Sequence, residues 1–107
     1  MHWLYASLSK ELQTHADEEI KHAKKINKHI NFLGGIPAVG VAQVLTASDN
    51  GAMLRQDLAG EEEAIRQYKK RIYQARQAGD YGTEAMLLGI LADEEHHAND
   101  LKTILEG

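Results

Sequence analysis

The chain has 107 residues, enough for one domain with one core and too few for a second. Its formal net charge of -4 argues against a general nucleic-acid-binding surface, and its 43% hydrophobic and 26% charged residues are ordinary for a soluble globular protein. There is no cysteine, which excludes disulfides, thiol nucleophiles and thiolate metal sites and leaves carboxylate and imidazole side chains as the available ligands.

The first predicted element is a long helix that covers about residues 3–33. It stops at Gly34 and Gly35, with Pro37 just beyond, a strong pattern for a helix end. The following residues, 36–48, contain valine and glycine without a clear period, so we interpret them as a connection long enough to travel the length of a bundle.

A second helix is predicted to start at a cap supplied by Ser48 or Asp49 and to run to about Ala78, where Gly79 ends it. The third starts at a cap from Asp80 or Thr83.

This third helix reaches Glu106, and only a few residues separate it from the second, so the two helices should form an antiparallel hairpin. The fold class is therefore all-α, with three long helices and a crossover connection between the first and the second. We expect residues 1–107 to form a single, partial domain.

Each predicted helix places a glutamate near the middle of the apolar stripe that a turn of about 100° per residue defines. The stripes comprise Leu4, Leu8, Leu12, Ile26, Ile30 and Leu33; then Leu54, Leu58, Ile65, Tyr68 and Ile72; then Leu87, Ile90, Leu91, Leu101 and Leu105. The glutamates are Glu19, Glu61 and Glu94. A single buried carboxylate is explained by a salt bridge or partial exposure, but three at mid-helix indicate metal binding, because an ionised group is costly to bury unless it is paired or bound to a metal.

Two of these glutamates precede a histidine by three residues. Glu19 pairs with His22 and Glu94 with His97, in the similar segments EEIKHA and DEEHHA. Residues three apart on a helix share a face and can bind one cation, so the two segments predict two pseudo-equivalent metal positions. Glu61 would then be a bridging or terminal carboxylate.

The chain resembles bacterioferritin, in the ferritin-like di-iron carboxylate superfamily. The resemblance covers EEIKHAKKINKHINFLGGIP, MLRQDLAGEEEAI, GDY and DEEHHANDLKTILE. It implies a ferritin-like helical bundle in which one Glu from each of two helices and a Glu-x-x-His from each of the other two bind a di-iron centre. The implied metal ligands are Glu19, His22, Glu61, Glu94 and His97.

The resemblance also implies roles near the metal and shows two departures. Glu18 and Asp93 match acidic positions that orient the ligand histidines. Tyr68 could hydrogen-bond a ligand, although the simpler interpretation is an aromatic residue of the core. Bacterioferritins bind haem through a methionine at the position of Ile20, so we expect no haem there. The family's first helix, which carries a fourth glutamate, is lacking from this sequence, so one copy alone is not expected to complete the site.

These features predict an iron-binding protein whose di-iron ferroxidase centre oxidises Fe(II) for storage or detoxification, with manganese or zinc able to compete. We expect no catalytic residue beyond the ligands. The alternatives are a rubrerythrin-like di-metal peroxidase, which the lack of cysteine disfavours, and a truncated, non-catalytic helical oligomer that retains incomplete ligands.

The expected partners are further copies of the same chain, in a dimer or larger homo-oligomer that covers exposed apolar stripes. Neither nucleic acid nor a membrane is expected as a partner. No apolar stretch approaches the roughly 20 residues that span a bilayer, and no signal-peptide pattern is found, so the expected location is cytoplasmic.

Several basic residues and histidines have a structural interpretation that is simpler than a functional one. The basic clusters around Lys24 and around Lys70 are interpreted as solvated helix faces. His15 and His29 lie seven residues to either side of His22; we interpret His15 as packing beside the core and His29 as lying in water near a helix end.

Overall fold

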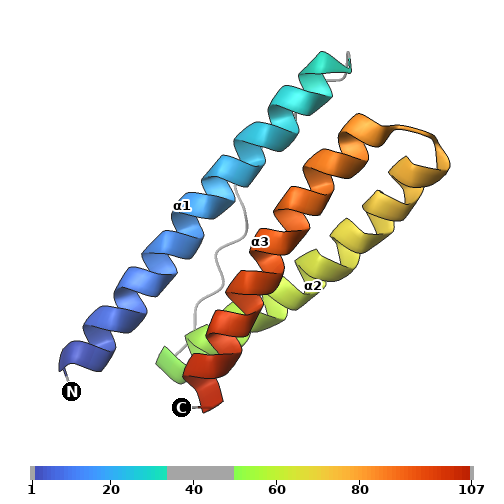
Figure 1. Ribbon diagram of the computed structural model, residues 1–107. Helices are drawn as coiled ribbons and strands as arrows, with labels where there is room; N and C mark the ends of the chain where they lie inside the picture. Colours follow the sequence, from blue (N-terminus) through green and yellow to red (C-terminus); the bar gives the residue numbers. More distant parts are fainter. Residues whose placement is uncertain (1, 34–49, 107) are drawn as a thin grey trace. The chain divides into compact units, whose positions relative to one another are not determined.

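The computed structural model describes residues 2–33 and 50–106, and this part of the chain is built from three α-helices (Figure 1). They are α1 (His2–Phe32), α2 (Asn50–Gln77) and α3 (Tyr81–Glu106). The described ranges contain no strand, which confirms the predicted all-α class. The predicted connection and the caps Ser48 and Asp49 lie outside the described residues.

The chain divides into two compact units, Met1–Val41 and Ala42–Gly107. Helix α1 belongs to the first unit, and α2 with α3 to the second. Across the described residues, no helix combines the length and the apolar character that crossing a membrane requires.

Helix α1 ends one residue earlier than predicted. The backbone N–H of Leu33 still donates a hydrogen bond to the carbonyl of His29 at 3.0 Å, which closes the last turn. The Leu33 side chain is 57% exposed, so its predicted place on a buried stripe is wrong, because it follows the last helical residue. The other described stripe positions, Leu12, Ile26 and Ile30, are half-buried, whereas the side chains of residues 4 and 8 lie outside the description.

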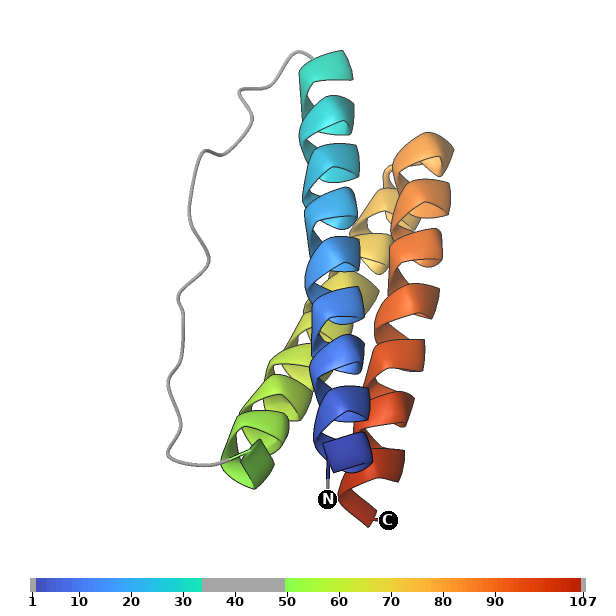
Figure 2. The same ribbon diagram turned by 90° about the vertical axis from the view of Figure 1, so that its left-hand side faces the viewer.

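Helices α2 and α3 pack against each other as the predicted antiparallel hairpin, seen from two directions in Figures 1 and 2. The polypeptide reverses at Gly79, whose φ of 72° lies in the left-handed region that glycine adopts without steric cost. The N–H of Gly79 donates to the Arg76 carbonyl at 3.1 Å, and the N–H of Asp80 donates to the Ala75 carbonyl at 2.9 Å. These two bonds form a Schellman motif, so the prediction that Gly79 ends α2 is confirmed.

Asp80 caps the start of α3. Its Oδ1 accepts a hydrogen bond from the backbone N–H of Thr83 at 3.2 Å, and its Oδ2 accepts one from the Thr83 hydroxyl at 2.6 Å. Of the two predicted caps, Asp80 is therefore the one that satisfies the free N–H groups of the first turn.

The hairpin is held by an apolar cluster near its turn and by an ion pair beside it. The cluster comprises buried Ile72, Leu87 and Leu91, with Ile65, Tyr68 and Met86 packed against it. Arg76 Nε lies 2.7 Å from Glu84 Oε2. This cross-helix pair and the cluster fix which residues of α2 and α3 lie opposite one another.

The outer surface of α2 carries charges that are neutralised locally. Glu63 accepts hydrogen bonds from Gln67 Nε2 at 3.0 Å and from Arg66 Nη2 at 2.6 Å. These two hydrogen bonds and the positive charge of Arg66 hold the pKa of the Glu63 carboxyl below its ordinary value. The arrangement is a solvent-exposed side-chain network and lies outside the hairpin core.

Two glycines of the hairpin should respond in opposite directions to alanine. Gly79→Ala forces an L side chain into positive φ and should lower the free energy of unfolding by about 1 kcal/mol. Gly89→Ala, at a helical position of α3 where an added Cβ meets no atom within 4 Å, should raise it by about 0.5–1 kcal/mol. Urea unfolding followed by circular dichroism measures both, and a neutral Gly79→Ala would contradict the described turn.

Candidate metal centre

Three of the predicted ligands come together in the middle of the α2–α3 hairpin. The antiparallel register that places Arg76 beside Glu84 also brings Glu61 of α2 beside His97 of α3. Glu94 lies one helical turn before His97 on the same face of α3. The hairpin alone therefore supplies two carboxylates and one imidazole to a single location.

The geometry of this cluster suits a shared cation. His97 Nδ1 lies 3.7 Å from Glu61 Oε1, and one ligand atom from each of Glu61, Glu94 and His97 lies within 4.8 Å of the others. A distance of 3.7 Å is long for a hydrogen bond, but two atoms that each bind one ion at about 2.1 Å can be up to about 4.2 Å apart. The separation fits two ligands of the same metal ion.

All three side chains are buried. The exposed fraction is 1% for Glu94, 2% for His97 and 6% for Glu61. Their sequence neighbours Glu95 and His96 are exposed, as the helical period predicts. Two carboxylates at this depth carry a high cost in free energy unless positive charge compensates them, and a divalent cation provides that compensation.

The donor atoms also restrict the kind of metal. Carboxylate oxygen together with imidazole nitrogen, and no sulfur, suits iron, manganese or zinc. The hairpin residues thus fit the metal that the sequence resemblance implies.

The other two predicted ligands, Glu19 and His22, lie one turn apart on α1. His22 is buried and Glu19 is exposed. The prediction of a buried mid-helix glutamate is therefore confirmed for Glu61 and Glu94 and is wrong for Glu19. The stripe that contains Glu19 is itself only half-buried at Leu12, Ile26 and Ile30, so a place on it does not ensure burial.

The positions predicted to support the ligands differ in their exposure. Glu18 is half-buried and Asp93 is exposed, and each lies four residues before a predicted ligand histidine on its own helix. Tyr68 is half-buried and packs against the apolar cluster of the hairpin, two turns from Glu61. The packing agrees with Tyr68 as a core aromatic, and the roles of Glu18 and Asp93 remain predictions.

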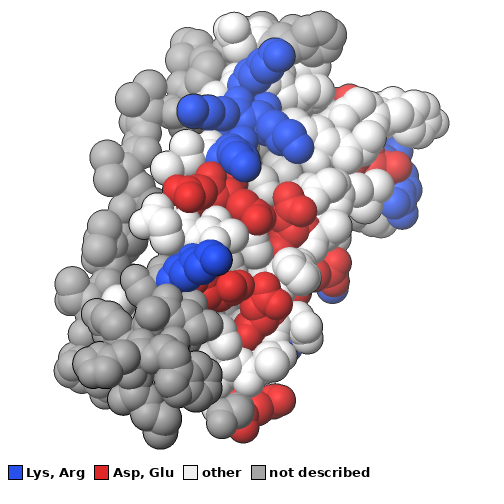
Figure 3. Space-filling model, turned by 60° about the vertical axis from the view of Figure 1, so that its left-hand side comes forward, with Lys and Arg blue, Asp and Glu red and all other residues white. Residues whose placement is uncertain are grey.

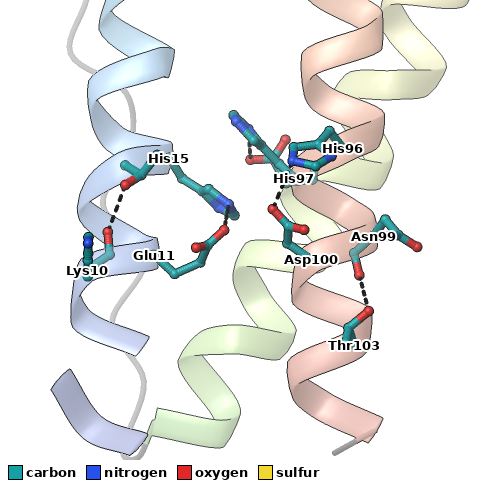
Figure 4. A network of polar contacts seen from close by, with 10 residues as sticks. Lys10, Glu11, His15, His96, His97, Asn99, Asp100 and Thr103 are labelled. Atoms are coloured by element: carbon teal, nitrogen blue, oxygen red, sulfur yellow. Dashed lines mark hydrogen bonds and ion pairs between the residues drawn. The ribbon is translucent and has the colours of Figure 1, made fainter. Parts of the chain in front are cut away.

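Two contacts within helices were not predicted from the sequence. On α1, the Nε2 atom of His15 lies 3.1 Å from Glu11 Oε1 (Figure 4). On α3, exposed His96 lies 3.5 Å from Asp100 in the same spacing of four residues. This spacing is the signal that could have found both pairs, because residues four apart share a helix face.

Comparisons with known proteins agree with the fold. The family model described as the ferritin-like domain matches residues 2–107. A bacterioferritin from Brucella melitensis is 33% identical over 105 residues, covering 97% of this chain and 65% of its own length. A bacterial ferritin from Neisseria meningitidis is 34% identical over 101 residues, covering 94% of this chain and 66% of its own length. A bacterioferritin from Mycobacterium avium is 32% identical over 108 residues, with coverages of 97% and 66%.

The chain thus spans just under two thirds of the length of these relatives. The match nevertheless extends over almost all of the residues present here, including all three described helices. The chain belongs to the ferritin-like domain family.

Proposed function

We propose that this chain binds iron at a carboxylate- and histidine-ligated di-metal centre and oxidises Fe(II) for iron storage or detoxification. The residues proposed to hold the two metal ions are Glu19, His22, Glu61, Glu94 and His97. Iron is the expected metal, and manganese or zinc can occupy the same donor set.

The observation that carries the proposal is the burial of Glu61, Glu94 and His97 within reach of one another. An apolar hairpin has no structural need for two buried carboxylates, since leucine at either position would pack without a desolvation cost. Similarity to proteins named bacterioferritin and bacterial ferritin supports iron as the occupant.

Bound iron would supply one-electron redox chemistry in which two Fe(II) ions are oxidised to Fe(III). With peroxide as the oxidant, the two electrons and two protons convert one peroxide molecule into two water molecules. The protein's own contribution is positioning and charge. The carboxylates of Glu61 and Glu94 would place negative charge beside the iron, which favours the more highly charged Fe(III) ion. The imidazole of His97, on the helix opposite Glu61, would add a neutral ligand.

The first test is an anaerobic Fe(II) titration followed by exposure to air, recorded by near-ultraviolet absorbance. Wild-type protein should bind Fe(II) saturably, near two ions per site, and oxidise it faster than buffer does. Glu61→Ala removes the hairpin carboxylate beside His97 and should slow oxidation by at least about tenfold.

Glu63→Ala is the matched control, because Glu63 lies on the same helix but is exposed and bonded to Arg66. It should oxidise iron at the wild-type rate. Equal, buffer-like rates in all three proteins would defeat the proposal and favour an incomplete helical scaffold. Turnover that requires peroxide and an added reductant would favour the peroxidase alternative.

Because the carboxylates are buried, we also predict that a residue needed for metal binding lowers the stability of the metal-free protein. In metal-free protein at neutral pH, Glu94→Gln keeps the shape but removes one of two neighbouring buried negative charges, and it should raise the free energy of unfolding by about 1–2 kcal/mol. Adding Zn²⁺ should raise the melting temperature of the wild type and leave that of Glu94→Gln nearly unchanged.

Exposed Glu95 provides the control for this experiment, because it is the next residue on α3. Glu95→Gln should match the wild type both with and without Zn²⁺. A destabilised metal-free Glu94→Gln protein would show that the carboxylate has a structural role and would count against the metal centre.

We further propose that the chain works as a homo-oligomer, a dimer or larger. Exposed apolar residues on α1 and on the hairpin, such as Ile20, Tyr73 and Leu88, provide surface for self-association. Light scattering coupled to size-exclusion chromatography should give a mass of at least twice that of one chain. A monodisperse monomer would refute this expectation, and a cytoplasmic location stays a prediction.

A further inference from the structure

A stripe of lysines runs along the C-terminal half of α1. The lysine stripe consists of Lys21, Lys24, Lys25 and Lys28, all exposed, at successive spacings of three, one and three residues. This spacing places the four side chains on one face over two helical turns. Among the residues that the structure describes, these four line a shallow surface groove of about 340 Å³, and Figure 3 shows lysine and arginine side chains gathered on this part of the surface.

The centre of the lysine stripe lies on the side of α1 away from Glu19, one of the two predicted metal ligands of this helix. At about 100° per residue, the four lysines centre roughly 190° around the helix axis from Glu19. Ile26 and Ile30 lie close to the Glu19 direction instead. The centre of the stripe lies about 110° from His22, and Lys25 at its edge lies about 60° from that residue. Most of the stripe therefore faces away from the predicted ligands, and its function needs its own explanation.

The positive charge of the stripe is not compensated along its own helix. The segment 20–33 contains no acidic residue, so Lys24, Lys25 and Lys28 have no carboxylate within one turn in either direction. Lys21 differs, because it has Glu18 three residues and Asp17 four residues before it on the helix.

Such an arrangement destabilises the helix, because like charges three or four residues apart repel each other. Two cations of α2 are paired with carboxylates: Arg66 is 2.6 Å from Glu63, and Arg76 is 2.7 Å from Glu84. The basic segment 69–71 of α2 also lacks an acidic residue within one turn, but its side chains follow one another in sequence and so point in directions about 100° apart. The helix macrodipole favours cations only in the last turn of a helix, and all four lysines lie before the last turn of α1, whose one basic residue is His29. Neither local pairing nor the dipole explains the stripe.

We propose that the lysine stripe binds a compact polyphosphate anion, with inorganic tripolyphosphate as the representative ligand. Lysine ammonium groups act as point charges with rotatable donors, which suits phosphate oxygens in several orientations. The stripe spans about 10.5 Å along the axis, enough for a linear triphosphate and short for a long polymer. It contains no aromatic residue on which a base could stack, and the whole chain is negatively charged, so nucleic acid is a poorer fit.

The test is calorimetric titration of metal-free, full-length protein with inorganic tripolyphosphate at low and at physiological salt. Wild-type protein should bind saturably, and its affinity should fall as salt rises. Lys24→Gln/Lys25→Gln, which removes the centre of the stripe, should bind at least about tenfold more weakly. The substitutions remove repulsive pairs and keep good helix formers, so circular dichroism should show an intact fold.

Lys69→Gln/Lys70→Gln is the matched control, because it removes two adjacent exposed lysines from α2. It should bind tripolyphosphate like the wild type. Equal loss in both variants would show a response to net charge alone and would overturn the proposal, as would no binding by the wild type. Tighter binding to a short DNA duplex, or to vesicles containing anionic lipid, than to tripolyphosphate would also overturn it.

Discussion

The tight turn at Gly79 sets the register on which the hairpin and its candidate metal centre depend. Positive φ at this residue lets α2 finish with a Schellman motif, and Asp80 starts α3 immediately afterwards. Because the turn contains no additional residue, Arg76 lies beside Glu84. About four helical turns farther from the turn, Glu61 lies beside His97. One added residue would rotate α3 by about 100° and carry His97 away from Glu61. A local backbone constraint thus determines a distant side-chain contact.

The same hairpin combines two environments with opposite requirements. Near the turn, Ile72, Leu87 and Leu91 form an apolar cluster that stabilises the packing of α2 on α3. Further along the same faces, Glu61 and Glu94 occupy positions where apolar residues would pack at no electrostatic cost. The apolar cluster can offset the destabilising effect of the buried carboxylates. Functional sites often lower the stability of a protein, and the rest of the core then compensates for that loss. Under the proposed function, metal binding would add stability to the hairpin.

Sequence reasoning predicted the helices and the hairpin ligands because both follow from helical periodicity. Glu94 and His97 are adjacent on one face by spacing alone, and glycine followed by a capping residue marks the turn. It could not predict the exposure of Glu19, because the width of a solvent-facing surface depends on every neighbouring side chain. Nor did it find the Glu11–His15 contact, since a histidine has several partners within one turn and only the rotamer selects among them.

Helix α1 shows how one helix can carry two incompatible chemistries. In sequence, Lys21 stands between Glu19 and His22, where a fixed ammonium group would compete with a metal cation for the same ligands. Helical geometry reduces the conflict, because Lys21 points about 160° away from Glu19 and about 100° away from His22. The centre of the lysine stripe shares that direction, so most of its positive charge faces water while the Glu19 carboxylate lies on the other side of the helix. Substitutions in the stripe should therefore alter anion binding and leave metal binding unchanged, which separates the two proposals experimentally.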